Sequence, residues 1–397
     1  MTLREYYHLT KDVFSIDPRE DAKEYFGGTT LFHQIRDRIK SDFVQQRQVP
    51  KFCLYGAYGS GKTHTLHHVE YVLRTDFDAD FPTDVIELEI SPIRAKESWK
   101  KVHGDLINAI SLERMKQAVA AVFADPKAAQ EPLRILKSQG ILRFGEAAIQ
   151  SSQAQVFRSL VYGGRGEALA LEWLKGTPLT IDQAQTIGTE TNLTEPSHLI
   201  ACVLNVASLL LHGLGKRPVV LIDEAESLGN LTNHDSIEEF KFAFRRLFDN
   251  ENDVLGTVVA FQHEGGIEQA PEVLSEDAVM RRIDYEAGYF DLGRLVVEMN
   301  DVREFILQVL AYLVDQDAAR RTIDDEDLGT QPEYFPFTEE AVDLIANDLT
   351  QADKQLPSQI ISKLSAAVVQ GWMKADGSGH VLIDEDMARG ALYPEDV

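Results

Sequence analysis

The sequence predicts an α/β protein with a parallel sheet, a large helical insertion and a C-terminal helical lid domain. Short apolar runs alternate with segments of helical periodicity, which is the pattern of a parallel sheet joined by crossover helices. From residue 291 onward the periodicity is helical. The chain has 397 residues, 44% of them hydrophobic, which is enough for a large core and a second domain.

Four apolar runs are interpreted as strands. The run Val219–Ile222 contains no polar residue, as expected of a strand that is buried on both faces of a parallel sheet. Shorter or mixed runs at 52–55, 85–90 and 255–261 are each bounded by turn residues or by a glycine.

We expect four regions along the chain. An N-terminal segment (1–29) precedes an α/β domain (30–290), a helical lid domain (291–375) and a short tail (376–397). Helical stretches fill about 96–212, which is too long for an ordinary connection, so this insertion is expected to have its own function. The pattern Ser236–Glu239 predicts a capping box at the start of a helix over 235–248. Residues 315–333 are interpreted as an acidic linker.

The net charge is −25, from 64 acidic and 39 basic side chains. A protein that covers nucleic acid with its whole surface would be basic, so this class is excluded. Contact with DNA would need a basic partner or local patches, for which the candidates are Arg47 with Lys51 and Arg245 with Arg246.

The cysteines and the apolar runs point to a cytoplasmic protein. Cys53 and Cys202 lie in apolar segments and are interpreted as core residues rather than a disulfide pair. No apolar run reaches the ~20 residues that span a bilayer, and the first residues lack the pattern of a signal peptide.

The loop Gly56-Ala57-Tyr58-Gly59-Ser60-Gly61-Lys62-Thr63 matches the phosphate-binding P-loop. Its glycines let backbone N–H groups turn inward onto phosphate oxygens, Lys62 neutralises the β/γ charge, and the Thr63 hydroxyl can bind Mg²⁺. A strand precedes the loop and a helix follows it, as this chemistry requires. We therefore expect ATP and Mg²⁺ as cofactors, bound by residues 56–63 together with His64. GTP is not expected, because the sequence has no Asn-Lys-x-Asp base-reading motif.

Asp223 and Glu224 directly follow the 219–222 strand. Ligands of α/β sheets bind at the carboxyl ends of the strands. Asp223 is therefore expected to hold Mg²⁺, and Glu224 to activate or orient the attacking water. The alternative is a pair that only caps the next helix. A second Asp-Glu pair, Asp384-Glu385, is interpreted as an acidic helix start.

Two further positions are candidates for the reaction. Gln262 and His263 follow the 255–261 strand and could touch the γ-phosphate or the attacking water, unless they belong to an ordinary loop. Arg281 and Arg282 could reach the γ-phosphate of a neighbouring subunit, unless they are a solvated helix end.

The three histidines 64, 67 and 68 have the spacing of metal ligands. A zinc site is not expected there, because no carboxylate or cysteine accompanies them at a matching spacing.

In this order, the P-loop, Asp223-Glu224, the polar position 262–263, the arginine pair and the helical block resemble the AAA+ ATPases of the origin-recognition-complex type. The resemblance covers residues 30–375. It implies a P-loop NTPase fold with a five-stranded parallel sheet, hydrolysis through Glu224, and self-association that brings an arginine from a neighbouring subunit.

A second resemblance lies in the insertion. Residues 167–179 and 185–188 look like a segment of bacterial P-loop ATPases from phage-defence gene clusters, including the BREX systems. This resemblance implies an ATP-driven component of a multiprotein antiviral machine, with DNA contacted through the assembly.

The chain departs from the first family at two points. Leu356-Pro357 is followed by Ser358 where the lid of that family often has an arginine, so phosphate sensing by the lid would depend on Lys363. About 20 residues follow the lid, too few for the winged-helix domain of origin-recognition proteins. Two alternatives stay open, a switch that binds ATP without needing turnover and, with less support, a P-loop kinase.

Overall fold

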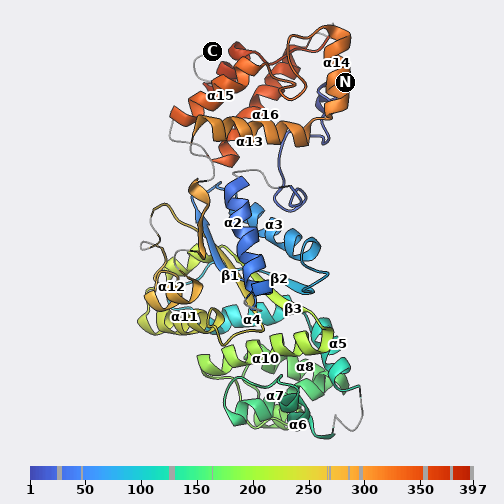
Figure 1. Cartoon of the computed structure of the whole chain (residues 1–397). Helices are drawn as coiled ribbons and strands as arrows, with labels where there is room; N and C mark the ends of the chain where they lie inside the picture. The colour runs from blue at the N-terminus through green and yellow to red at the C-terminus, as the bar shows by residue number, and fades with distance from the viewer. Residues whose placement is uncertain are drawn as a thin grey trace. The chain divides into compact units, whose positions relative to one another are not determined.

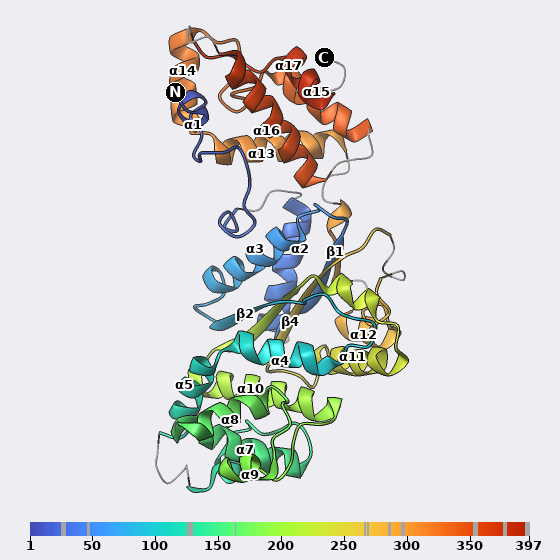
Figure 2. The same cartoon turned by 180° about the vertical axis from the view of Figure 1, so that it is seen from behind.

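The computed structural model describes the chain except for residues 25–28, 46–47, 125–129, 163, 266, 268–269, 285–286, 295–297, 352–355, 376–378 and 394–397. The described chain divides into two compact units (Figures 1 and 2). We call them the sheet unit, which comprises 36–55 and 69–290, and the helical unit, which comprises 1–35, 56–68 and 291–397.

The sheet has five parallel strands in the order β2-β3-β4-β1-β5, as predicted. The strands are β1 (Lys51–Gly56), β2 (Thr83–Glu89), β3 (Arg217–Asp223), β4 (Gly256–Gln262) and β5 (Tyr289–Asp291). The four located from the sequence are confirmed within one or two residues at most ends. The fifth, β5, has three residues and therefore carries no readable pattern.

Three helices form the layer that packs on the sheet. These are α4 (Trp99–Ile110), α10 (Pro196–Leu214) and α11 (His234–Leu247); α4 contacts β2, α10 contacts β3, and α11 contacts both helices. The fully buried Trp99 ring meets Phe240 and Phe244 edge-on at 5.6 and 6.0 Å. Both ends of the predicted insertion thus belong to the layer that covers the sheet.

The remainder of the insertion is a group of shorter helices around α10. They are α5 (Leu112–Val122), α6 (Pro132–Ser138), α7 (Ala147–Tyr162), α8 (Arg165–Leu174) and α9 (Ile181–Thr186). Helix α5 packs on α10 and α7, and α7 packs on α8. Trp173, in the segment that resembles defence ATPases, is a fully buried core residue whose indole N–H donates to Thr191 O.

The sheet unit contains further helices, two of which, α2 and α3, belong to it only in part. They are α2 (Thr29–Lys40) with its π-helical extension Ser41–Gln45, α3 (Lys62–Thr75), the 3₁₀ turn η3 (Ala225–Asn230) and α12 (Asp277–Ile283). The capping box predicted at Ser236 is wrong: the N-cap of α11 is Asn233, whose side chain accepts from Ser236 N–H. The cap lies three residues earlier because Asn, like Ser, binds the open N–H groups of a first turn.

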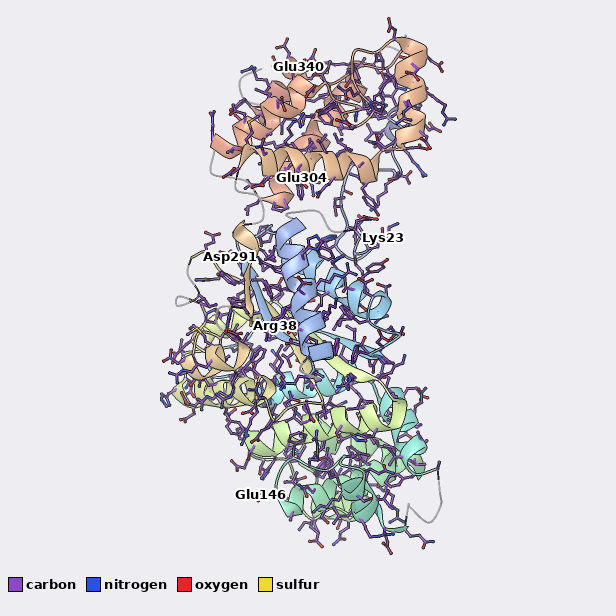
Figure 3. All side chains as sticks on the ribbon, viewed as in Figure 1. Lys23, Arg38, Glu146, Asp291, Glu304 and Glu340 are labelled. Atoms are coloured by element: carbon purple, nitrogen blue, oxygen red, sulfur yellow. The ribbon has the colours of Figure 1, made fainter. Side chains whose placement is uncertain are left out.

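The helical unit is built from α1 (Leu3–Tyr6), α13 (Met299–Leu313), α14 (Gln316–Glu326), α15 (Glu339–Gln351), α16 (Pro357–Lys374) and α17 (Glu385–Leu392). The predicted acidic linker is wrong in part, because α14 lies inside it and is capped by Asp315. Asp384 caps α17, which confirms the interpretation of the second Asp-Glu pair. Acidic side chains such as Glu304 and Glu340 are exposed on this unit (Figure 3).

The first residues of the chain are part of the helical unit. The hydroxyl groups of Tyr6 and Tyr7 donate to the backbone carbonyls of Gly379 and Val381, at 2.7 and 2.9 Å. Leu9 forms an isolated antiparallel bridge with Val314. These bonds hold the N-terminal segment against the C-terminal helices.

Of the basic residues expected to form surface patches, Lys51 and Arg245 are engaged within the fold, whereas Arg246 is about half exposed. Lys51 is buried, and its ammonium donates to the carbonyls of Asp249 and Asn252. Burial lowers the pKa of Lys51 to about 8. Arg245 is paired with Glu238 and Glu276, and Arg47 lies outside the described residues. The prediction that Lys51 forms part of a surface patch is therefore wrong, because its side chain is buried and its ammonium is hydrogen-bonded inside the fold.

Helix α10 is the one helix, among the described residues, long and apolar enough to cross a membrane, and it is mostly buried within the sheet unit. Its Asn205 is fully buried and fully bonded: the side-chain oxygen accepts from the N–H groups of Arg143 and Phe144, and the amide group donates to Phe144 O and Gln153 Oε1. These bonds fix the rotation of an otherwise apolar helix.

We predict that Asn205→Leu destabilises the sheet unit by about 3 kcal/mol or more, because it strands several buried polar groups at once. Ser208→Ala on the same helix removes one bond, to Gly140 O, and should cost about 1 kcal/mol. Urea unfolding of both variants measures the difference. Equal stability of the two variants would contradict the role given to Asn205.

Candidate functional site

The carboxyl ends of three neighbouring strands define the candidate site. β1 ends at Gly56, β3 at Asp223 and β4 at Gln262. Since β3, β4 and β1 are consecutive in a parallel sheet, these ends lie along one edge. This edge is where α/β sheets bind their ligands.

The P-loop has the backbone that phosphate binding needs. Gly59 and Gly61 have φ values of +82° and +91°, which disfavour residues with a Cβ. At Gly56 a Cβ would lie 2.6 Å from the hydroxyl of the buried Ser60, so the loop also needs glycine where it leaves β1. The Lys62 ammonium lies 3.1 and 3.0 Å from the carbonyls of Gly56 and Ala57. Tyr58 points into solvent, with 78% exposed.

Two histidines of α3 bind the N-terminal segment. His64 Nε2 lies 2.8 Å from Glu24 O, and His68 Nδ1 lies 2.7 Å from Ala22 O. A carbonyl can only accept, so each of these nitrogens carries a proton. Burial lowers the pKa of His64, which keeps the ring neutral near pH 7. The His64 side chain is thus engaged within the protein, and its part in nucleotide binding stays a prediction.

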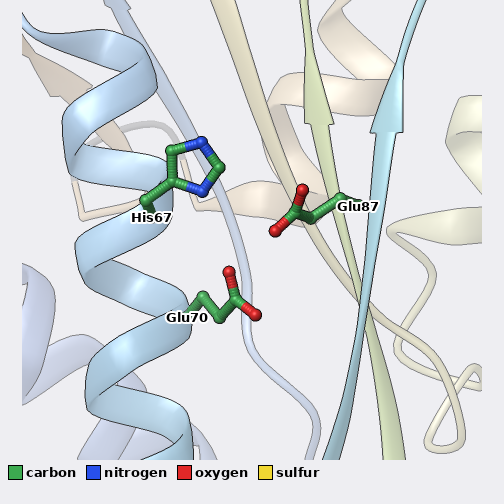
Figure 4. A group of neighbouring side chains, drawn as sticks. All are labelled: His67, Glu70 and Glu87. Carbon is green, nitrogen blue, oxygen red and sulfur yellow. The ribbon is translucent and has the colours of Figure 1, made fainter. Parts of the chain in front are cut away.

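Figure 4 shows three side chains that lie between the same helix and β2. Glu70 of α3 and Glu87 of β2 direct their carboxylates toward each other, and His67 precedes Glu70 by one turn. Arg74 pairs with Glu70 at 2.6 Å and balances its charge. One potential ligand atom from each of His67, Glu70 and Glu87 lies within 4.8 Å of the other two. The reason given for expecting no zinc site is therefore wrong, because Glu70 accompanies His67 at i+3 on the same helix; Glu87 could not be foreseen, because it comes from β2.

Glu224 stands in a strained turn directly after β3. Its φ of +59° is left-handed, which is rare for a residue with a side chain and concentrates at functional sites. The Glu224 N–H donates to Asp223 Oδ1 at 2.9 Å. Partial burial raises the pKa of Glu224, and neighbouring carboxylates, Glu226 first among them, raise it further. An acid whose pKa is raised is better suited to accept a proton from water.

Glu226 was not identified from the sequence. It lies in the first turn of η3, and its Oε2 accepts the backbone N–H of Gln262 at 2.9 Å. The bond joins the loop after β3 to the end of β4. An acidic residue two positions after the Asp-Glu pair was the only signal of this contact, and acidic residues are common at helix starts.

The polar position after β4 is partly engaged. Gln262 is the last residue of β4 and is half-buried, and His263 follows it outside the strand. The structure therefore places both beside the end of β3. Their contact with a nucleotide stays a prediction.

The structure distinguishes the two candidate arginines. Arg282 donates to Asp249 Oδ2 at 3.3 Å and to Ala278 O at 2.7 Å, so its guanidinium is held within the sheet unit. Arg281 is 82% exposed, and the nearest carboxylate, Asp277, lies 3.8 Å away. Of the two, Arg281 is the more exposed, and its action on a neighbouring subunit stays a prediction.

The helical unit contributes two contacts at the positions singled out in the lid. Ser358 N–H donates to Gly59 O at 3.3 Å. Lys363 donates to the carbonyls of Ala391 and Leu392, at the C-terminus of α17, at 3.3 and 2.9 Å. The Lys363 charge therefore stabilises a helix end, and a role for it in place of the lid arginine stays a prediction.

No protein-family model and no curated protein matches the chain. Among solved structures, the Aeropyrum pernix ORC1 protein in complex with DNA is similar over 94% of this chain and 67% of its own, with 10% identity and a TM-score of 0.43. The Aeropyrum pernix ORC2 protein in its ADPNP-ADP complexes is similar over 94% of this chain and 70% of its own, with 11% identity and a TM-score of 0.44.

Domain III of the Thermotoga maritima replication initiation protein DnaA is similar over 96% of this chain and 98% of that domain, with 12% identity and a TM-score of 0.38. At these identities and TM-scores the likenesses do not bear on the chemistry of the site.

We predict that Lys363→Met loosens α17 without changing nucleotide affinity. Removing the ammonium leaves two helix-end carbonyls unbonded, at a cost of about 1 kcal/mol. Lys374→Met, at the exposed end of α16, is the matched control. Hydrogen exchange of residues 385–392 and the affinity for a fluorescent ATP analogue measure the two effects. A loss of affinity confined to Lys363→Met would restore this lysine as a phosphate sensor.

Proposed function

We propose that this chain is an AAA+ ATPase of the origin-recognition-complex type, which binds ATP with Mg²⁺ and hydrolyses it. One observation carries the proposal: a P-loop and an Asp-Glu pair follow two strands of one parallel sheet, at the same edge. The strained turn at Glu224 supports a chemical role for that residue rather than a helix cap, because its side chain makes no capping bond to η3.

Each residue has a defined role in this proposal. Backbone N–H groups of the P-loop bind the phosphates, and Lys62 neutralises their charge. Thr63 and Asp223 hold Mg²⁺, since oxygen ligands are those that Mg²⁺ prefers. Glu224 takes or orients the proton of the attacking water, and Gln262 or His263 orients the reacting groups.

A non-catalytic ATP switch is the second candidate. The observation in its favour is the engagement of Lys363 by α17, which leaves the lid without the charge that the family resemblance would place on the γ-phosphate. The switch would need nucleotide binding but not Glu224.

ATP-dependent assembly would connect the site to a larger machine. Arg281 is exposed and suited to act on a neighbouring subunit. Lys51 is buried and Arg245 is paired, so these two residues do not add to a basic face on a chain of charge −25. We therefore place DNA contact, and a role in defence against phage, in an assembly with other subunits.

Two substitutions separate binding from turnover. Lys62→Ala should abolish ATP binding, because the loop alone leaves the β/γ charge uncompensated. Glu224→Gln should keep binding and slow hydrolysis by roughly 10²-fold or more, because the amide cannot accept the proton. Nucleotide affinity and phosphate release are the measurements. Unchanged affinity of a folded Lys62→Ala protein would sink the proposal, whereas binding without turnover in the wild type would favour the switch.

A mixing experiment tests action between subunits. Arg281→Ala and Lys62→Ala should each be inactive, and their mixture should regain part of the hydrolysis, because one mixed interface pairs an intact P-loop with an intact arginine. Arg282→Ala is the control, since its guanidinium is bound to Asp249 and Ala278. Normal hydrolysis by Arg281→Ala would exclude it as the arginine donor.

A further inference from the structure

Glu226 lies where the groups of the proposed reaction leave the sheet. One of its carboxylate oxygens accepts the Gln262 N–H at 2.9 Å, and Glu226 follows Glu224 by two residues, in the first turn of η3. The three residues come from two neighbouring strand ends, β3 and β4.

The Gln262 N–H is at the last position of β4, where the ladder with β3 has already ended. The register of β3 with β4 runs from Val219 to Ile222 on β3 and ends at Val259 on β4. Backbone donors beyond the ladder need another acceptor. The Glu226 carboxylate is that acceptor. It thereby fixes the position of Gln262, at the end of β4, relative to the turn that contains Glu224.

A helix-start role alone does not account for this geometry. An acidic side chain in a first turn is favoured by the open N–H groups of its own helix. The Glu226 carboxylate instead accepts from Gln262, which lies 36 residues further along the chain at the end of another strand. The bond therefore connects the segment after β3 to the end of β4, and it does not cap the helix in which Glu226 lies.

We propose that Glu226 is a positioning residue of the hydrolytic site, which sets Gln262 and Glu224 in register with each other. This inference rests on the proposed function. Its role requires an acceptor atom at the right reach, not a negative charge. Displacements of about 1 Å in such groups cost up to roughly 10²-fold in rate without a matching loss of binding.

Three substitutions separate reach from charge. Glu226→Gln keeps an acceptor oxygen at the same distance, Glu226→Asp keeps the charge and shortens the side chain, and Glu226→Ala removes both. Glu251→Ala removes an exposed acidic residue of the same unit and is the control. For each full-length protein the measurements are ATP affinity, kcat, and hydrogen exchange at the Gln262 amide.

We expect Glu226→Ala and Glu226→Asp to lose roughly tenfold or more in kcat, with ATP affinity within twofold of the wild type and faster exchange at Gln262. Glu226→Gln should stay near the wild type in both readouts. A Gln variant as slow as the Ala variant would overturn the inference, because charge and not reach would then matter. So would unchanged kcat in the Ala variant.

The outcome is separable from that of the proposed function. Absence of wild-type turnover contradicts hydrolysis itself, and leaves the exchange of the Gln262 amide as the test of the Glu226 contact. Wild-type turnover that is lost in Glu224→Gln and unchanged in Glu226→Ala overturns the positioning role alone.

Discussion

The parallel direction of β1, β3 and β4 is the constraint on which the rest of the site depends. Because these strands are neighbours in the sheet, each one delivers the residue after its carboxyl end to the same edge. The P-loop, the acidic pair and the polar side chain can then lie along one edge, although Thr63 and Asp223 are 160 positions apart in the sequence and Gln262 follows Glu224 by 38. An antiparallel partner in the middle of this set would send one of the three groups to the opposite edge.

This edge concentrates negative charge. Glu89 ends β2 beside Asp223 in the register, and Glu224 and Glu226 follow within three residues. Partial burial and then repulsion among these groups disfavour the ionised form and raise the pKa of Glu224. A divalent cation would relieve the repulsion. The same repulsion makes it favourable for the Glu226 carboxylate to accept the Gln262 N–H, because this hydrogen bond stabilises the charged form.

The sequence predicted what depends on short-range pattern. The apolar run of β3, the glycines of the P-loop and the cap of α17 each lie within a few residues, and each was found where expected. Features decided by distant contacts were not predictable. The sequence alone indicates that Lys51 is a surface charge. Only the tertiary structure shows that the carbonyls of Asp249 and Asn252 accept hydrogen bonds from its ammonium. The three residues of β5 become a strand only because β1 is beside them, and Glu226 gains its role only from the end of β4.

Helix α10 has a consequence for how the protein can be divided. It packs on β3 on one side and on α5 on the other, so it belongs to the core of the sheet layer as well as to the inserted helices. Cutting out the whole range 96–212 would remove α4 from β2 and most of α10 from β3. Excision of α5–α9 alone would instead uncover an apolar flank of α10, and that surface would drive aggregation. A shortened version of this protein therefore needs polar replacements along α10 before it needs a new linker.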